Sequence, residues 1–137
     1  MDQKILDLVA TERVCALSIC RPDGTCDSAA MHYSHSADPF VIYIQTENTS
    51  RKCKSLPAPA SIVIGFNEET MTTLQLEGQI KIVSDSSQLP TIHQIHYAKH
   101  PHAEKYKSDP ATVFLVCAPS WWRYMDYKVS PPLSISG

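Results

Sequence analysis

The chain has 137 residues and a formal net charge of −2, with 43% hydrophobic and 19% charged residues, which fits one globular domain with its own core. This slightly acidic balance argues against a sequence-independent nucleic-acid binder, which needs a basic excess. The longest apolar run, residues 113–118, is far shorter than the roughly 20 residues of a membrane-spanning helix, and the N-terminus does not resemble a signal peptide. We therefore expect a single cytoplasmic domain over residues 1–137, with no nucleic-acid or membrane partner.

The first half of the chain predicts one helix followed by strands. Apolar residues recur at helical spacing up to about residue 11, and Asp2 is placed to cap this helix. Residues 14–20 and 25–33 predict a hairpin, and residues 40–46 predict the next strand. A short basic helix is expected to follow that strand.

The second half predicts more strands around one helical excursion. Residues 60–66 and 71–83 are strand-like, and Gly78 marks a bulge or bend in the second. Residues 85–98 predict a helix. The last strand segments are residues 112–118 and 121–127, separated by Pro119 and Ser120. These strands with helices outside them favour an α+β, mainly β fold, built as a small antiparallel barrel. With four glycines and no glycine-rich phosphate loop, the usual dinucleotide and nucleoside-triphosphate folds are excluded.

The short basic helix carries Arg51, Lys52 and Lys54 close behind hydroxyl residues that follow a strand. Such an arrangement is a physically sensible place to hold a phosphate. An ordinary cap by Thr49 or Ser50, with the cations on a solvated face, explains the same residues. However, cations in a first helical turn oppose the helix macrodipole, and an anionic ligand would remove that conflict. From spacing alone, both interpretations stay open.

The five cysteines form no Cys-x-x-Cys pair, so neither a zinc knuckle nor a thioredoxin-type redox pair is indicated. We expect reduced thiols, with Cys15 and Cys117 as small core residues. Cys53 lies between two lysines, where the pKa of a thiol can fall, although an unremarkable helix residue is the favoured interpretation.

Histidines cluster between His93 and His102. His93, His96 and His100 are spaced three and four residues apart, so a continuous helix would place them on one face, where zinc is chemically possible. No His-Glu-x-x-His pattern is present, and Pro101 interrupts the region. A solvated helix is therefore predicted rather than a metal site.

Two adjacent tryptophans, Trp121 and Trp122, fall in the last predicted strand. Neighbouring strand residues point to opposite faces, so one can be core while the other needs an interface. The C-terminal tail, residues 129–137, carries Leu133 and Ile135, which leaves two alternatives. The tail packs along a dimer surface, or it is a frayed terminus.

Taken together, four segments resemble the flavin-binding split barrels related to pyridoxamine 5′-phosphate oxidase, in particular short members like the general stress proteins. The segments are residues 28–33, 40–46, 50–56 and 75–79, which follow the family's order over about residues 3–127. The resemblance implies a six-stranded antiparallel split β-barrel with peripheral helices. It also implies FMN as the cofactor, bound at the subunit interface of a homodimer, and a small-molecule substrate.

The resemblance also assigns roles to individual residues. Ser50, Arg51 and Lys52 match the block that grips the FMN phosphate, while Gln45 and Thr46 match positions near the ribityl chain. Ala30, Met31 and His32 match the segment along the flavin ring. Where the best-known members carry an arginine and a lysine, this sequence has Ser28 and either His32 or Tyr33. Thr73 falls near a flavin-contacting glutamine, Trp122 would approach the partner's FMN, and Arg123 would contact an anion. The full predicted set is Ser28, Ala30, Met31, His32, Gln45, Thr46, Ser50, Arg51, Lys52, Thr73, Trp122 and Arg123.

The implied activity is that of an FMN-dependent reductase or oxidase of an unidentified small molecule. Oxidation of pyridoxamine phosphate itself is not expected, because residues 123–128 lack the Arg-x-His element of the true oxidases. Flavin chemistry resides in the cofactor, so no catalytic side chain is assigned. Two alternatives remain, namely a non-enzymatic flavin-binding or sensor dimer, and a haem-binding split barrel that uses a histidine between His93 and His102. Deazaflavin is a further substitute for FMN.

Overall fold

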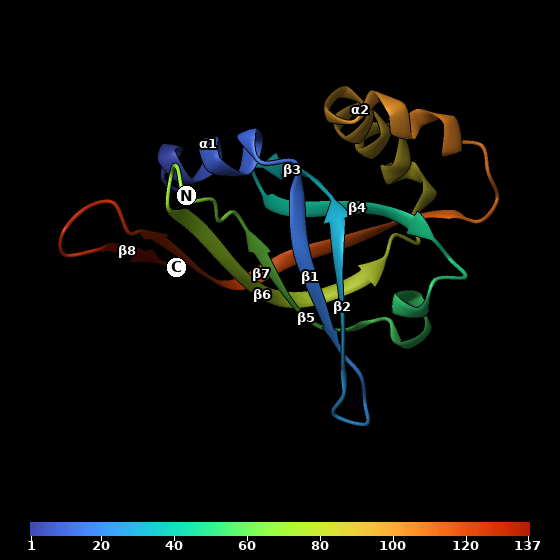
Figure 1. Cartoon of the computed structure of the whole chain (residues 1–137). Helices are drawn as coiled ribbons and strands as arrows, with labels where there is room; N and C mark the ends of the chain where they lie inside the picture. The colour runs from blue at the N-terminus through green and yellow to red at the C-terminus, as the bar shows by residue number, and fades with distance from the viewer.

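A computed structural model describes all residues, 1–137, and its main element is a curved antiparallel sheet (Figure 1). The elements in chain order, with η for a 3-10 helix, are α1 (Gln3–Thr11), β1 (Val14–Cys20), β2 (Cys26–His32), β3 (Ser34–Ala37), β4 (Phe40–Glu47), η1 (Arg51–Ser55), β5 (Ala58–Ile64), β6 (Thr72–Ile82), η2 (Ser86–Gln88), α2 (Leu89–Lys99), η3 (Pro101–Tyr106), β7 (Thr112–Asp126) and β8 (Leu133–Ser136).

The sheet is an incomplete barrel. Its strands follow the order β2-β1-β5-β6-β7-β4-β3, and every neighbouring pair is antiparallel. The sheet curls until β2 contacts β4, but no ladder of hydrogen bonds joins these two strands. The predicted α+β, mainly β class and the antiparallel split barrel with peripheral helices are therefore confirmed, and the split lies between β2 and β4.

The predicted count of six strands is too low. Seven strands follow one another through the sheet, and β8 pairs with β7 as an additional strand. β3 has only four residues, Ser-His-Ser-Ala, and so offers too short a pattern for recognition. β8 lies in the C-terminal tail, which folds back on its own β7 rather than fraying. β7 itself runs unbroken through Pro119.

Gly78 explains how a strand can pass through Pro119. The register of β6 and β7 shifts between Glu77 and Gly78, so the predicted bulge is confirmed. A Cβ on Gly78 would lie 2.7 Å from the carbonyl oxygen of Ala118, so the bulge needs a residue without a side chain here. Proline is tolerated in a sheet at such a bulge because the local ladder is already interrupted.

The helices cover two parts of the barrel. The side chain of Asp2 accepts a hydrogen bond from the backbone N–H of Lys4, which confirms the predicted cap of α1, and Ile5 and Val9 are fully buried beneath that helix. The helical excursion predicted from residue 85 is η2 followed by α2. In Figure 1, α2 lies at one end of the barrel, beside β4.

Two apolar clusters form the interior. The larger fills the barrel and includes Leu17, Ile62 and Leu76, and the smaller joins Ile92, Tyr97, Ala103 and Phe114 between the sheet and α2 with η3. Cys15 and Cys117 belong to the larger cluster, as predicted. Burial raises the pKa of Cys15 to about 12 and that of Cys117 to about 11, so both stay as unreactive thiols near neutral pH.

No helix is long and apolar enough to cross a membrane.

Candidate functional site

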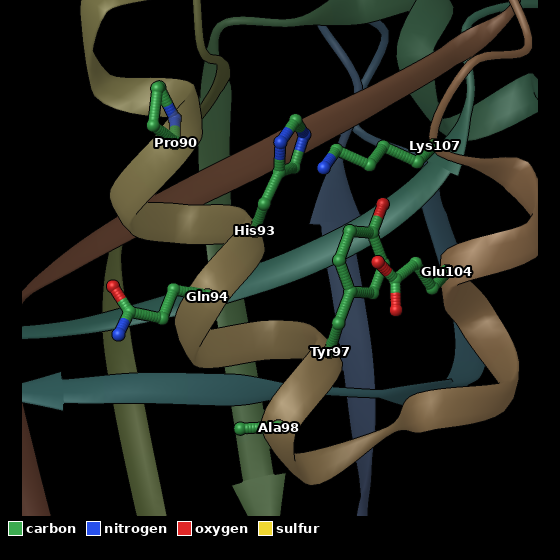
Figure 2. A pocket seen from close by; sticks show the side chains of 7 residues that line it. All are labelled: Pro90, His93, Gln94, Tyr97, Ala98, Glu104 and Lys107. Carbon is green, nitrogen blue, oxygen red and sulfur yellow. The ribbon is translucent and has the colours of Figure 1, made fainter.

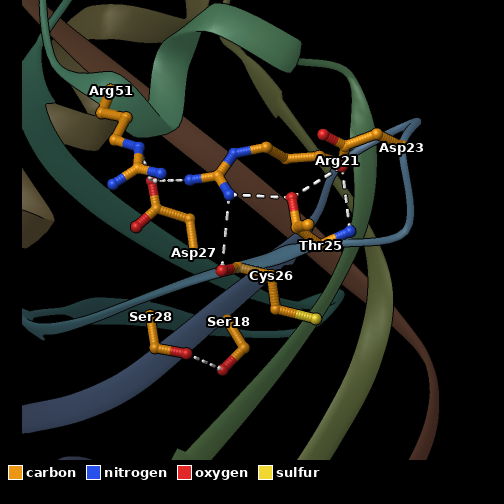
Figure 3. A network of polar contacts seen from close by, with 8 residues as sticks. All are labelled: Ser18, Arg21, Asp23, Thr25, Cys26, Asp27, Ser28 and Arg51. Carbon is orange, nitrogen blue, oxygen red and sulfur yellow. Dashed lines mark hydrogen bonds and ion pairs between the residues drawn. The ribbon is translucent and has the colours of Figure 1, made fainter.

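Two guanidinium groups meet one carboxylate at the end of the split between β2 and β4 (Figure 3). Arg21 follows β1, Asp27 belongs to β2, and Arg51 begins η1. The Oδ2 atom of Asp27 lies 3.2 Å from Nη2 of Arg21 and 4.0 Å from Nε of Arg51. We call these three residues the arginine cluster. The side chain of Arg51 is 74% exposed, so it can reach a ligand at little cost.

The cluster leaves one buried donor unsatisfied. Nη1 of Arg21 donates to the hydroxyl of Thr25 at 3.0 Å and to the carbonyl oxygen of Cys26 at 3.5 Å. Nη2 is buried. It lies 3.2 Å from Oδ2 of Asp27, which is close enough for an ion pair, but its N–H group does not point at that oxygen well enough for a hydrogen bond. A buried donor without a partner costs about 1–3 kcal/mol. A phosphate group, with several acceptor oxygens, fits the excess of donors and of positive charge.

The segment after β4 is a single 3-10 turn of five residues, so the argument from a helix macrodipole does not apply to it. Lys52 and Lys54 lie in its last turn, where cations are not opposed. Ser50 stands at the N-cap position without a capping bond, and its hydroxyl donates to Sγ of Cys53 at 3.3 Å instead. The hydroxyl of Thr46 donates to that of Ser50 at 3.5 Å. Thr46 and Ser50, two of the predicted site residues, are thus in contact, and Arg51 follows directly in the chain.

Gln45 and Thr46 point to opposite sides of β4. Oε1 of Gln45 accepts a hydrogen bond from the hydroxyl of Tyr97 at 2.6 Å, and Nε2 donates to the carbonyl oxygen of Ala103 at 3.3 Å. Gln45 therefore fastens α2 and η3 to the sheet, and its amide is already occupied. Gln45 and Thr46 also line a hollow of about 210 Å³ beside Tyr106.

One surface of the sheet, which we call the open face, carries the side chains that alternate with those of the barrel core. Strand register places Ser18, Ser28, Ser61, Glu77 and Trp121 in one row across β1, β2, β5, β6 and β7 on this face. The hydroxyls of Ser18 and Ser28 lie 2.8 Å apart. These side chains are exposed or half-buried, whereas their strand neighbours point into the barrel.

Five predicted site residues share the open face, because residues two positions apart on a strand point the same way. They are Ser28, Ala30, His32, Thr73 and Arg123. The guanidinium of Arg123 donates twice to Oε1 of Gln75, at 3.1 and 2.7 Å, and the hydroxyl of Thr73 donates to the carbonyl oxygen of Ile64 at 3.2 Å. The arginine cluster lies beside the hairpin turn on the opposite side of β2, because Asp27 alternates with Cys26 and Ser28 along the strand (Figure 3).

Met31 and Trp122 point away from the open face. Both pack against the main core, and Trp122 also lies against Gly137, with which it exchanges two backbone hydrogen bonds of 3.1 Å. The exposed tryptophan is Trp121, at 37%. The structure thus assigns the two faces that the sequence left open.

The expectation of a solvated histidine helix is wrong for His96 and His100, which are 1% and 0% exposed. Their rings lie 4.9 Å apart, and His100 lies 4.9 Å from His32, which lies 5.3 Å from His102. We call these four residues the histidine cluster. α2 packs on β3, and this contact buries the face of the helix that carries His96.

The buried histidines are bound to the protein itself. Nε2 of His100 donates to the carbonyl oxygen of Tyr33 at 2.7 Å, so its Nδ1 is the acceptor for Nη2 of Arg13 at 3.3 Å. Nδ1 of His96 lies 2.7 Å from the hydroxyl of Ser34. Burial lowers the pKa of His96 to about 3 and also lowers the pKa of His100 and of His32. All three are neutral at pH 7, and no three His, Cys, Asp or Glu side chains are arranged to hold a metal ion.

Another hollow lies over α2 and η3, away from the arginine cluster (Figure 2). Its volume is about 560 Å³, and only two of its seven lining residues are hydrophobic. His93 faces it, stacked on Tyr97 at 5.4 Å between ring centroids, with Glu104 and Lys107 opposite. Ligand pockets are mostly apolar, so this polar hollow is the weaker candidate site.

Comparison with known families identifies the family to which this fold belongs. Residues 1–126 match the family described as pyridoxamine 5′-phosphate oxidase. The chain belongs to this family. No curated protein matches the sequence.

Solved structures agree with this membership in the pyridoxamine 5′-phosphate oxidase family. General stress protein 26 from Bacillus anthracis is 22% identical, with a TM-score of 0.72 over 97% of this chain and 95% of that one. A pyridoxamine 5′-phosphate oxidase-related, FMN-binding protein from Nostoc punctiforme is 14% identical, with a TM-score of 0.71 over 98% and 94%. A haem-binding protein from Mycobacterium smegmatis is 15% identical with a TM-score of 0.74, and this chain, covered to 93%, spans 54% of its length. At these identities the likeness shows the fold alone.

Arg21 and Asp27 are the residues that sequence reasoning missed. The family resemblance directed attention to Ser28 as the hairpin residue nearest an expected arginine. Arg21 lies at the other end of the turn, and only the register of β1 and β2, which pairs Cys20 with Cys26, brings it beside Asp27. An arginine and an aspartate on either side of a Pro-Asp-Gly turn are the signal that could have indicated this contact.

Proposed function

We propose that the protein binds FMN along β2, with the phosphate at the arginine cluster, and acts as an FMN-dependent oxidoreductase of a small molecule other than pyridoxamine phosphate. One observation carries the proposal: two guanidinium groups converge on a single carboxylate oxygen, and one buried Nη2 atom has no hydrogen-bond partner. Family membership supports FMN as the ligand whose phosphate meets this demand.

Several side chains of the site would hold the phosphate end. Arg21 and Arg51 would donate charge-assisted hydrogen bonds, and Ser50 would turn its hydroxyl from Cys53 towards a phosphate oxygen. Lys52 would add positive charge, since it is half-buried in the same turn. Asp27 would lose its ion pairs with the two guanidinium groups when the phosphate binds. Thr46, hydrogen-bonded to Ser50, would orient that hydroxyl.

The ring end would lie along the edge of β2 that has no hydrogen-bonded neighbour. Bound FMN would supply the redox chemistry, so the protein needs only to orient the ring and exclude competing reactions. Ala30 permits close approach of the ring to the backbone, and Met31 supports the strand from the core side. His32 stays neutral at pH 7 because burial and the nearby His102 lower its pKa, so it can offer one hydrogen bond without a charge.

A second copy of the chain is proposed to cover the open face, apart from its hairpin end, and to complete the site. This face presents Trp121 together with Ala16 and Val63, and a groove of about 380 Å³ crosses it between Ser18 and Ser120. Exposed apolar side chains on one face of a sheet suit an isologous dimer contact. Thr73, Arg123 and Trp121 would then lie near the partner's cofactor. We also propose that the protein is located in the cytoplasm.

The substrate is proposed to differ from pyridoxamine phosphate. The end of β7 and the residues after it read Arg123-Tyr124-Met125-Asp126-Tyr127-Lys128, so an Arg-x-His element is absent from this region. Arg123 is also occupied by Gln75. A substrate phosphate would therefore lack its usual partners here.

The decisive experiment is the absorbance spectrum and the mass of whatever co-purifies with the protein, followed by titration with FMN and with riboflavin. We expect flavin bands and an FMN mass, and FMN binding at least tenfold tighter than that of riboflavin, which lacks the phosphate. Protein that neither retains nor binds FMN would contradict the proposal. Oxidation of a reduced nicotinamide by the FMN-loaded protein separates an oxidoreductase from a non-enzymatic flavin-binding dimer.

Haem is the second candidate, because one structural neighbour is described as haem-binding. His96 and His100 are committed to Ser34, Tyr33 and Arg13, so an axial ligand would have to be His93 or His102. The hollow beside His93 is polar, whereas haem needs an apolar slot. A Soret band after haem addition would favour this candidate over FMN, and the mass of the bound molecule separates FMN from deazaflavin.

A further inference from the structure

We propose that Cys20 and Cys26 form a redox-active dithiol, which a peroxide such as hydrogen peroxide oxidises to a disulfide. The two residues are directly opposite one another in the β1–β2 ladder, and both are exposed. The proposal concerns this pair alone and does not depend on FMN binding.

The backbone sets the distance between the two residues. The N–H of Arg21 donates to the carbonyl oxygen of Thr25 at 2.8 Å, which makes Arg21 and Thr25 the hydrogen-bonded pair of the ladder. Cys20 and Cys26 are therefore a non-hydrogen-bonded pair, in which Cα atoms lie about 4.5 Å apart. Disulfides span Cα separations of about 4.4–6.8 Å. The bridge needs no movement of the strands.

The side chains of this face do meet across the ladder. Ser18 and Ser28 form the next pair on the same face, and their hydroxyl oxygens are 2.8 Å apart. The neighbouring thiol of Cys26 raises the pKa of Cys20, as expected when two sulfurs are in contact. The pair also lies at the end of the hairpin that projects beyond the rest of the barrel (Figure 1), where a small oxidant has access.

The other three cysteines lack such an arrangement. Cys15 and Cys117 are buried in the larger apolar cluster, where an oxidant has no access to the sulfur. Cys53 is half-buried, and its sulfur contacts the hydroxyl of Ser50 and the carbonyl oxygen of Glu47 rather than a second thiol. Only Cys20 and Cys26 combine exposure with an opposed sulfur.

The reaction balances in two steps. The thiolate of one cysteine attacks a peroxide oxygen, the O–O bond breaks, and a sulfenic acid and one water result after proton transfer. The thiolate of the other cysteine attacks the sulfenic sulfur, forms the S–S bond and releases the second water. Two thiols thus lose two electrons and two protons, and hydrogen peroxide takes both to become two waters. Because Arg21 follows Cys20 and Asp27 follows Cys26, the disulfide would stiffen the hairpin end that carries two members of the arginine cluster.

The test is thiol counting and intact mass of the folded, full-length protein before and after treatment with hydrogen peroxide at equimolar concentration. The wild type should lose about 2 Da, the mass of two hydrogen atoms. Its count of maleimide-reactive thiols in denaturant should fall from five to three. Dithiothreitol should restore all five, and a peptide joining Cys20 to Cys26 should appear on mapping.

Cys53→Ser should behave like the wild type in the loss of mass, and Cys20→Ser and Cys26→Ser should lose the response. Both are substitutions at exposed positions, so circular dichroism should show unchanged folding. Four results overturn the proposal. They are an unchanged thiol count, the same loss in Cys20→Ser, irreversible addition of oxygen to a single cysteine, and disulfide-linked dimers in place of the internal bridge.

Discussion

The arginine cluster and the histidine cluster both gather ionisable side chains from segments that lie far apart in the sequence, but they differ in how those side chains are paired. In the histidine cluster, both ring nitrogens of His100 bond to protein groups, and His96 bonds to Ser34. In the arginine cluster, two guanidiniums share one carboxylate, and a buried nitrogen has no hydrogen-bond partner.

The difference teaches that the number of titratable groups does not identify a ligand site. Six histidines draw attention in the sequence, yet the two buried ones bond to protein groups and fasten α2 to the sheet. The arginine cluster is smaller and more exposed, but its excess of donors and charge has no internal counterpart. We therefore expect changes at His96 and His100 to affect stability, and changes in the arginine cluster to affect ligand binding.

The largest effect on stability is expected for His100→Ala. If this substitution also altered FMN binding, the contrast between the two clusters would not hold. Removing the ring leaves the Tyr33 carbonyl and the Arg13 guanidinium without their partner and opens a cavity, so the free energy of unfolding should fall by about 2–4 kcal/mol. Urea denaturation measures this loss. Exposed His102→Ala is the control and should change stability by less than about 0.5 kcal/mol. An FMN affinity of folded His100→Ala that differs strongly from the wild type would contradict a purely structural role of His100.

The double variant Arg51→Ala/Lys52→Ala tests the opposite half of the comparison. It removes one charge-assisted donor and one neighbouring cation, so FMN should bind about 100-fold more weakly, equivalent to about 2.7 kcal/mol. Riboflavin affinity and thermal stability should stay as in the wild type. Isothermal titration with both ligands measures this, and Lys54→Ala serves as the matched control. Unchanged FMN affinity would place the phosphate elsewhere.

Acid should act on the histidine cluster, because the folded state lowers the pKa of His96 to about 3. The unfolded chain takes up this proton below about pH 6.5, whereas the folded protein does not. The contribution of neutral His96 to the free energy of unfolding is therefore fully present above about pH 6.5. It is lost progressively as the pH falls towards 3.

The loss is about 1.4 kcal/mol per pH unit for one histidine, or about 2 kcal/mol between pH 6.5 and pH 5. Urea denaturation over this range should show a shallower slope for His96→Gln, which can still bond to Ser34 but does not titrate. Equal slopes in the two proteins would mean that other groups cause the pH dependence.

The smallest effect is expected for Asp27→Asn, which tests whether Asp27 competes with the ligand for the two guanidinium groups. A neutral amide competes less than a carboxylate for Arg21 and Arg51, so FMN should bind about fivefold more tightly, or about 1 kcal/mol. Fluorescence titration of FMN can resolve this difference. Glu68→Gln removes a negative charge from the exposed turn between β5 and β6 and should leave the affinity unchanged. Weaker binding to Asp27→Asn would show that Asp27 positions the guanidiniums instead of competing for them.

Much of the fold could be predicted because its signals are local. The cap at Asp2, the hairpin around the Pro-Asp-Gly turn and the bulge at Gly78 each depend on a few neighbouring residues, and the structure contains all three. β3 and β8 could not be predicted in the same way, since four residues carry too little periodicity. They are strands because β4 and β7 offer them a partner.

The candidate site was predicted only in part, for the same reason. The segment from Thr46 to Lys52 is contiguous, so its hydroxyls and cations could be recognised as a group. Arg21 and Asp27 could not be joined to that group, because their contact depends on how the hairpin meets η1 across the split. The pairing of Cys20 with Cys26 likewise depends on the register of β1 and β2, which a spacing of six residues does not specify.

The sequence by itself determined the class of fold, the family and the basic segment after β4, because hydrophobic alternation, turn residues and short motifs are properties of neighbouring positions. The tertiary structure decided which charged and polar groups are satisfied. It buried His96 and His100 against β3, packed Trp122 on the core, and left Nη2 of Arg21 with an ion pair to Asp27 but no hydrogen-bond partner. Satisfaction of a polar group depends on partners distant in sequence, and only the folded chain brings these together.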